Sequence, residues 1–360
     1  MSRADVRGRR YPVASSRGYP EPRNPEHLEA SSPENPDARS REYPVRVVYL
    51  GGLGRSGSTL LERLLGELPG VCASGEIVHL WQRGVAENER CGCGLEFRAC
   101  DFWGRVGKEA FGGWDKIDTD RIGHLKDAVD RTRLIPRLSQ RTLARRLRAD
   151  LDAYSGYYLR LYRAIASVSG CDTIVDSSKH ASLAFCLSRC QEIDLRVIHM
   201  VRDSRAVAYS WTTKVARPEA GTAGPASYMT TYPPVRAAGH WNAQNGALQL
   251  LARRGTPLLL VRYEDLIQEP EQTVRRAATF AGVPAGHLSL PFLHTEGGAS
   301  YAELTEAHTA SGNPMRFATG RVPIKGDDRW RGAMPGRQRR TVTALTLPLL
   351  SRYGYLRRAA

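Results

Sequence analysis

Short apolar runs alternate with helical patterns along most of the chain. Four runs are continuous and rich in leucine or β-branched residues: VRVVYL (45–50), DTIVDSS (172–178), LRVIHMV (195–201) and PLLLVRY (257–263). Such runs are typical of strands that are covered on both faces. Helical patterns lie between them, beginning at Ser58 and spanning roughly 136–168, 180–190, 204–216 and 271–281. The alternation predicts an α/β fold, a parallel sheet flanked by helices on both faces.

This periodicity begins only at Val45. Residues 1–44 contain seven of the 21 prolines and many Ser, Glu and Arg residues. The composition predicts a disordered tail, followed by one domain over residues 45–360. Within that domain, residues 81–130 and the loop at 217–238 are expected to be insertions or lids over the sheet.

The chain of 360 residues has a formal net charge of +15, which favours an acidic partner. Nucleic acid, an anionic membrane and a polyanionic small ligand each fit that charge. No homeodomain, zinc-finger or RNP signature accompanies the arginines, so nucleic acid is not the expected partner. The sequence has no run of 18 apolar residues and no apolar stretch behind its basic N-terminus. We therefore expect a cytoplasmic protein without a transmembrane segment.

Three of the seven cysteines, Cys91, Cys93 and Cys100, lie together in CGCGLEFRAC. Their C-x-C-x6-C spacing lacks the paired C-x2-C turns of a structural zinc site, and no nearby histidine completes a set of four ligands. We therefore expect no metal here, and we interpret the cluster as a disulfide or as buried thiols.

A glycine-rich turn follows the first predicted strand, in YLGGLGRSGSTLLERLL. Compared with the P-loop pattern G-x4-G-K-[ST], it has Gly52 and Gly57 at the glycine positions, followed by Ser58 and Thr59. Glycines let successive backbone N–H groups point at phosphate oxygens, and the following helix adds its positive N-terminus. The turn therefore predicts a P-loop-like fold that binds phosphate or sulfate.

The turn lacks the lysine with which a nucleoside triphosphatase holds the β- and γ-phosphates. Ser58 stands in that place, and the cationic residue is Arg55, three positions earlier. Here the chain resembles the sulfotransferases, whose loop reads [KR]-S-G-[ST]-[ST] after the first strand, and the resemblance extends over about residues 45–332. It implies that the donor is 3′-phosphoadenosine 5′-phosphosulfate (PAPS) and that catalysis needs no metal. The implied donor-binding residues are Arg55, Ser56, Gly57, Ser58 and Thr59.

A second pair of residues follows the run LRVIHMV. Arg202 stands at its end and Ser210 lies eight residues later, about two helical turns away, so both can face one anion. Sulfotransferases have the same R-x7-S pair and bind the 3′-phosphate of the donor with it. The resemblance also implies nucleotide contacts from Tyr263, in RYEDL, and from a loop at 308–330. The candidates in that loop are Ser311, Gly312, Arg316 and Lys325.

Sulfuryl transfer needs cations beside the sulfuryl group and a base for the acceptor hydroxyl. Arg55 and Lys179 are the expected cations. Lys179 lies in VDSSKH, just beyond a predicted strand, where open α/β sheets bind ligands, and this segment resembles carbohydrate-type sulfotransferases. Glu76, in GVCASGEIVHL, is the expected base, because burial among apolar residues would raise its pKa. A similar glutamate is the base in tyrosylprotein sulfotransferases, and His79 is the alternative.

Two other classes of protein fit parts of the sequence. A P-loop kinase or nucleotide hydrolase would use the same turn, but it needs the missing lysine and requires magnesium. A nucleic-acid-binding protein would use the positive charge without any preference for the donor nucleotide. The motifs together favour a sulfotransferase, with the acceptor hydroxyl open among sugars, glycolipids, phenols and secondary metabolites.

Overall fold

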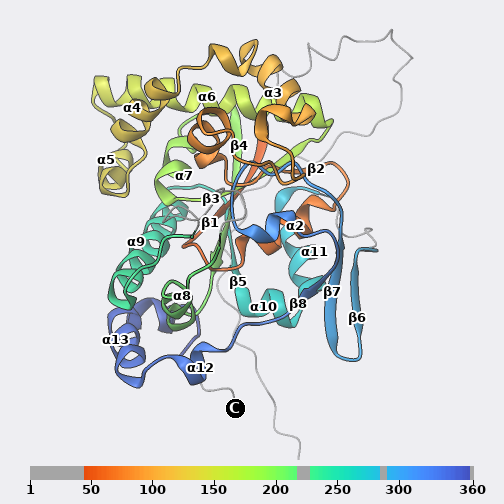
Figure 1. Ribbon diagram of the computed structural model, residues 1–360. Coiled ribbons are helices and arrows are strands. Elements are labelled where there is room, and N and C mark those ends of the chain that lie inside the picture. The colour runs from red at the N-terminus through yellow and green to blue at the C-terminus, as the bar shows by residue number, and fades with distance from the viewer. Residues whose placement is uncertain (1–43, 217–227, 284–289, 357–360) are drawn as a thin grey trace, which may run out of the picture.

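The computed structural model describes residues 44–216, 228–283 and 290–356 (Figure 1). All of the expected N-terminal tail except Pro44, and part of the expected loop at 217–238, lie outside these ranges. Within them, no helix combines the length and the apolar composition that crossing a membrane requires.

A five-stranded parallel sheet forms the centre of the domain, in the order β2-β3-β1-β4-β5. Its strands are β1 (Val45–Gly51), β2 (Val71–Ala73), β3 (Thr173–Lys179), β4 (Ile193–Val201) and β5 (Leu258–Arg262). The parallel sheet that the sequence predicts is confirmed. The central strand β1 has β3 on one side and β4 on the other, and ligands of open parallel sheets bind outside the carboxyl ends of strands at such a point.

Helices cover both faces of this sheet (Figure 1). Val47 and Tyr49 of β1 point into one core, and Val48 and Leu50 point into the other. The first core is closed by α3 (Asp101–Phe111), α4 (Thr119–Val129), α6 (Arg145–Ser169), α7 (Ala181–Leu187) and part of α9 (Pro234–Arg253). The second is closed by α2 (Ser58–Gly66) and α11 (Pro270–Ala281). Because both faces are covered, the strands are continuous apolar runs.

The remaining helical elements complete the domain. They are 3₁₀ turns at Ile77–His79, Phe97–Ala99, Trp114–Lys116, Thr132–Leu134 and Pro314–Phe317, a π-helical segment at Leu80–Ala86, and the helices α5 (Ile135–Leu138), α8 (Ser204–Ser210), α10 (Tyr263–Gln268), α12 (Trp330–Ala333) and α13 (Gly336–Arg352). The segment 81–130, expected as an insertion or lid, is largely helical. Its residues Trp81, Phe97 and Trp103 are buried in the first core, so much of it is an integral layer of the domain.

Several elements differ from the sequence-based expectation. A second sheet of three antiparallel strands is not predicted: β6 (Leu293–Glu296), β7 (Ala299–Leu304) and β8 (Gly320–Ile324). These strands are short and partly exposed, so no apolar run marks them. Helix α9 is also not predicted, because its buried side includes small and polar residues such as Ala238 and Asn245. The helix expected over 204–216 ends at Ser210.

Candidate active site

A cavity of about 850 Å³ opens at the carboxyl edge of the sheet, beyond the ends of β1, β3 and β4. Most of the residues that the sequence singles out line it: Arg55, Gly57, Ser58, Thr59, Glu76, Lys179, Arg202, Ser210, Tyr263, Gly312 and Lys325. Ser56, Ser311 and Arg316 do not line it. The fold therefore brings most of the candidate residues, which are spread along the chain, to one cavity.

The loop between β1 and α2 has the tight backbone that its glycines predict. Gly52 has a φ of 147°, and a Cβ there would lie 2.3 Å from the carbonyl oxygen of Met200. Gly57 precedes α2 with a φ of 85°, and its Cβ would lie 2.5 Å from Cδ2 of Tyr263. Only glycine fits at these two positions. Helix α2 then begins at Ser58, so its positive N-terminal end belongs to the cavity wall.

Arg55 has unsatisfied hydrogen-bond donors at the cavity. Its φ of 74° is unusual for a residue other than glycine, and its guanidinium lies over the ring of Trp211, 5.5 Å from the ring centre. Burial lowers the pKa of Arg55, but an arginine stays cationic. Among the described residues, no hydrogen-bond partner reaches its buried Nε and Nη2 or the buried Oγ of Ser56. Unpartnered buried donors are costly, so the Arg55 guanidinium, which lines the cavity, is suited to an incoming anion.

Arg202 follows β4 and is only 6% exposed. Its guanidinium donates to the carbonyl oxygens of Arg55, at 3.2 Å, and Asp327, at 2.7 Å. It also lies over the ring of Tyr263, 4.4 Å from the ring centre. Ser210 is the last residue of α8 and lines the same cavity. Arg202 therefore connects the phosphate loop to the C-terminal part of the chain, a contact that the sequence does not indicate.

Glu76 and Lys179 form a largely buried ion pair in the cavity wall, with side chains that are 13% and 12% exposed. Nζ of Lys179 lies 2.5 Å from Oε1 of Glu76, and Nε2 of His79 lies 3.6 Å from Oε2. Burial acts to raise the pKa of Glu76, but Lys179 and His79 outweigh it and hold this pKa at about 2. The expectation of a raised pKa is therefore wrong. Burial lowers the pKa of His79 to about 3, so its ring is neutral at pH 7.

Lys179 is positioned by its backbone as well as by this ion pair. It ends β3 with a φ of 71°, in the left-handed region that residues other than glycine rarely adopt. Its carbonyl oxygen accepts a hydrogen bond from the N–H of Gly52 at 3.1 Å, and its Nζ donates to the carbonyl of Ser177 at 3.0 Å. Such backbone conformations cluster at functional sites.

Glu62, which the sequence does not single out, supports the turn that carries Glu76. Its buried carboxylate accepts hydrogen bonds from the N–H of Gly75 at 2.6 Å and from Oγ of Ser177 at 2.7 Å. Burial is the main cause that raises the pKa of Glu62 to about 7. A glutamate in a helix usually faces solvent, so the sequence contains no signal for this role.

Two residues of the loop at 308–330, Ser311 and Gly312, lie directly beside Glu76. Gly312 is so close that a Cβ there would lie 2.9 Å from Oε1 of Glu76. Ser311 is buried, and its carbonyl oxygen accepts a hydrogen bond from the N–H of Glu76 at 3.2 Å. Its hydroxyl accepts one from Nη1 of Arg83 at 3.1 Å. Ser311 therefore holds the segment against the Glu76 turn.

Arg316 does not reach the cavity. It is 1% exposed and donates to the carbonyl oxygens of Thr309, at 2.9 Å, and Arg90, at 2.6 Å. Its own carbonyl accepts a hydrogen bond from Nη1 of Arg63 at 2.6 Å. The guanidinium of Arg316 therefore binds backbone carbonyls of the surrounding loops and does not face the cavity. The expectation that Arg316 contacts the donor is wrong.

The cavity has a strong excess of positive charge. Of the residues that the structure describes, eight cationic side chains and three carboxylates line it. The cations are Arg55, Arg83, Lys126, Arg131, Lys179, Arg202, Lys325 and Arg329, and the carboxylates are Glu76, Asp130 and Asp327. This excess suits a polyanionic ligand.

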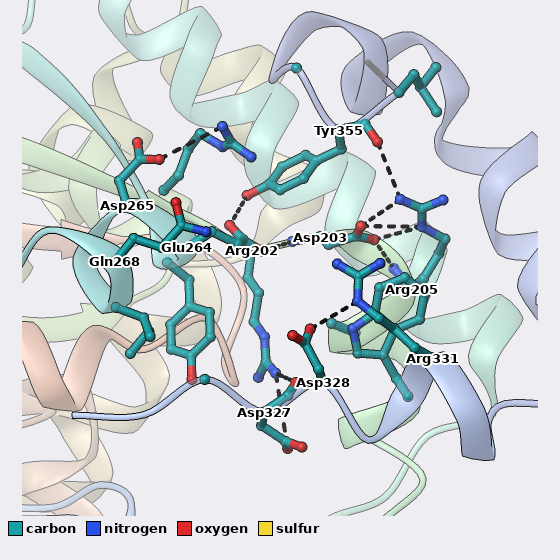
Figure 2. A pocket seen from close by; sticks show the side chains of 18 residues that line it. Arg202, Asp203, Arg205, Glu264, Asp265, Gln268, Asp327, Asp328, Arg331 and Tyr355 are labelled. Atoms are coloured by element: carbon teal, nitrogen blue, oxygen red, sulfur yellow. Dashed lines mark hydrogen bonds and ion pairs between the residues drawn. The ribbon is translucent and has the colours of Figure 1, made fainter. Parts of the chain in front are cut away.

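A second cavity, of about 550 Å³, is also lined by Arg202 and Asp327 (Figure 2). The described part of its lining holds four arginines and five carboxylates, and several of them pair with one another. Asp203 pairs with Arg205 at 2.6 Å, and Asp328 pairs with Arg331 at 3.1 Å. Because its charges are balanced internally, this cavity does not suit a polyanion, and the larger cavity is the better candidate.

The three clustered cysteines also differ from the expectation. His308 lies 208 residues after Cys100, and its Nδ1 is 3.3 Å from Sγ of Cys100. The ligand atoms of Cys91, Cys93, Cys100 and His308 all lie within 4.8 Å of one another. The statement that no histidine completes a set of four is therefore wrong, because the fold brings in a residue that is distant in sequence.

Residues 48–286 match the profile of the sulfotransferase family. No curated protein matches the chain. Among solved structures, the sulfotransferase domain of the Synechococcus PCC 7002 olefin synthase is 19% identical, with a TM-score of 0.45 over 89% of this chain and 98% of that one. The sulfotransferase domain of the curacin biosynthetic pathway is 16% identical, with a TM-score of 0.45 over 86% of this chain and 98% of that one. At these identities and TM-scores, the solved structures add no detail about the site.

Proposed function

Because this chain belongs to the sulfotransferase family, it is a sulfuryl-transfer enzyme, and we propose that its donor is PAPS. The donor carries a phosphosulfate at one end and a 3′-phosphate at the other, so it needs two anion sites in one cavity. One observation supports this donor above the others: the phosphate loop and Arg202 line a single cavity, in which the described cationic side chains outnumber the described carboxylates by eight to three.

The phosphate loop holds the phosphosulfate in this proposal. Arg55, Gly57, Ser58 and Thr59 line the cavity and offer backbone N–H groups, hydroxyls and the unpartnered Nε and Nη2 of Arg55 to its oxygens. Ser56, in the same loop, does not line the cavity, and its unpartnered hydroxyl is its proposed contribution.

The second anion site holds the other end of the donor. Arg202 and Ser210 bind the 3′-phosphate, and the ring of Tyr263, against Arg202, contacts the nucleotide. Gly312 and Lys325 complete the wall, while Ser311 acts by positioning Gly312.

Glu76 acts as the base in the proposed reaction. An acceptor hydroxyl loses its proton to the Glu76 carboxylate as its oxygen forms a bond to sulfur. The bond between sulfur and the phosphate oxygen breaks, and 3′-phosphoadenosine 5′-phosphate (PAP) leaves with the electron pair of that bond. Negative charge spreads over the sulfuryl oxygens and the leaving phosphate, where Arg55 and Lys179 stabilise it.

The Glu76–Lys179 pair adds a requirement to this mechanism. A carboxylate with a pKa of about 2 is a weak base. We propose that the negatively charged sulfuryl group of the bound donor attracts the Lys179 ammonium away from Glu76. This proposal rests on the position of Lys179 and Glu76, which line the cavity that would hold the donor. Removal of that cation would raise the pKa of Glu76. The base would then become stronger only when the donor is bound.

Transfer of labelled sulfur tests the proposed function. The enzyme is incubated with ³⁴S-labelled PAPS and a small-metabolite extract, and products that gain the labelled sulfate are sought by mass spectrometry. Labelled products are expected without added magnesium, and a Glu76→Gln enzyme serves as the control. Phosphorylated products with ATP and magnesium, and none with PAPS, would instead favour a P-loop kinase.

A further inference from the structure

We propose that Cys91, Cys93, Cys100 and His308 form a structural zinc site. The four residues come from two segments, residues 91–100 and the stretch that leads to Ser311. Three thiolates and one imidazole are a common ligand set for structural zinc. This site lies outside the cavity described above, because none of the four residues lines that cavity.

The distances between ligand atoms fit a tetrahedral metal. Zinc–sulfur bonds of about 2.3 Å and zinc–nitrogen bonds of about 2.0 Å place two sulfurs about 3.8 Å apart, and a sulfur and a nitrogen about 3.5 Å apart. Sγ of Cys93 and Sγ of Cys100 are 3.8 Å apart. Nδ1 of His308 lies 3.3 Å from Sγ of Cys100 and 3.9 Å from Sγ of Cys91.

Backbone amides also point at the three sulfurs. The N–H of Cys93 donates to the sulfur of Cys91, that of Leu95 to the sulfur of Cys93, and that of Trp103 to the sulfur of Cys100. Hydrogen bonds of this kind stabilise thiolates, which are the form that binds a metal. A disulfide between Cys93 and Cys100 would use only two of the four residues, and it would leave Cys91 and His308 without a function in the cluster.

The surroundings of His308 fix its ring. The side chain of Phe102 stacks on it, with ring centres 5.0 Å apart and planes 11° from parallel. The N–H of Gly92 donates to the carbonyl of Thr309 at 2.9 Å, and a Cβ at Gly92 would lie 2.4 Å from the carbonyl oxygen of Ala307. The two segments are therefore in backbone contact directly beside the proposed ligands.

The position of the site suggests what the metal does. His308 lies three residues before Ser311, whose carbonyl accepts the hydrogen bond from Glu76. A zinc ion on His308 and the cysteines would cross-link this segment to residues 91–100 across a large sequence separation. Such a cross-link stabilises the fold and keeps the segment against the Glu76 turn.

Metal analysis of the full-length protein tests the proposal. The protein is produced without a histidine tag in zinc-supplemented medium, and its metals are measured by mass spectrometry. We expect one zinc ion per chain in the wild type and in the control Cys171→Ser, whose sulfur lies outside the cluster. Cys100→Ser and His308→Ala should lose most of the zinc and unfold at a lower temperature.

A measurement on the wild type covers the case in which these variants do not fold. Titration with a mercurial thiol reagent should release zinc as the clustered thiols react, and cobalt substitution should give the visible bands of a tetrahedral thiolate site. Wild-type protein without zinc, and with a Cys93–Cys100 disulfide in its peptide map, would overturn the proposal. Full zinc occupancy in both ligand variants would overturn it as well.

Discussion

The substitution Glu76→Gln tests two properties of Glu76 that can be measured separately: the contribution of its ion pair with Lys179 to folding stability, and its proposed role as the catalytic base. The substitution keeps the shape of the side chain and removes both its charge and its basicity. A carboxyl whose pKa falls from 4.5 to about 2 on folding stabilises the folded state by about 3 kcal/mol at neutral pH. Glu76→Gln also leaves Lys179 buried without its partner, which acts in the same direction.

The pH dependence of that loss follows from the sign of the pKa change. The folded-state pKa of Glu76 is lowered, so its contribution to stability is fully present above pH 4.5 and disappears as the pH falls toward about 2. Denaturant unfolding at a series of pH values should therefore show a difference between wild type and Glu76→Gln that narrows in acid. The double variant Glu76→Gln/Lys179→Met should recover stability at neutral pH, because it also removes the ammonium that Glu76→Gln alone leaves without its ion-pair partner.

Catalysis should respond differently from stability. Loss of the base should lower the rate with PAPS by roughly 10²–10⁴ in both Glu76→Gln and the double variant. Affinity for PAP should stay close to wild type in Glu76→Gln. His79→Ala should cost far less, because its neutral ring is the partner of Glu76 rather than the proposed base. A normally active Glu76→Gln enzyme beside an inactive His79→Ala enzyme would refute the assignment.

Two further predictions concern the donor site and a supporting carboxyl. Arg202→Ala should weaken PAP binding about ten- to a hundredfold, as expected for a charge-assisted contact of roughly 1.5–3 kcal/mol. Calorimetry should show a much smaller loss for adenosine 5′-phosphosulfate, which lacks the 3′-phosphate, and an equal loss for both would show that Arg202 is only structural. Glu62 has a raised pKa, so its contribution to stability is present below pH 4.5 and is lost as the pH rises through about 7. As the pH rises from 4.5 to about 7, the unfolding free energy of Glu62→Gln should therefore increase relative to that of the wild type. A difference that stays constant over this interval would contradict the raised pKa of Glu62.

The sheet and the phosphate loop could be predicted because their causes are local. Strands β1, β3 and β4 are covered on both faces, so they appear as continuous apolar runs. The backbone geometry of the loop requires glycine at Gly52 and Gly57, so the loop is recognisable from the spacing of its glycines in the sequence. The strands β6 to β8 are partly exposed and short, and local patterns do not distinguish them from a loop.

The features that sequence reasoning missed depend on contacts between distant residues. Glu76 is predicted to be buried and its side chain is only 13% exposed, but its pKa is lowered by Lys179, about 100 residues away. In the same way, the cysteine cluster looks incomplete until the fold places His308 beside it. Arg316 is cationic and lies in the expected loop, yet the backbone carbonyls around it turn it inward. In each case the sequence identifies the residue but does not indicate which distant residue it contacts in the fold.

Ligand-induced thermal stabilisation tests the identity of the donor most directly. Unfolding is followed by calorimetry in buffer without added divalent metal, with PAP, with ATP, and with ATP plus magnesium. Because the cavity combines a phosphate loop that lacks the P-loop lysine with a second anion site at Arg202, PAP should raise the unfolding temperature strongly and without metal. ATP should raise it much less, with or without magnesium. Equal stabilisation by PAP and ATP, or a strict magnesium requirement, would contradict the account.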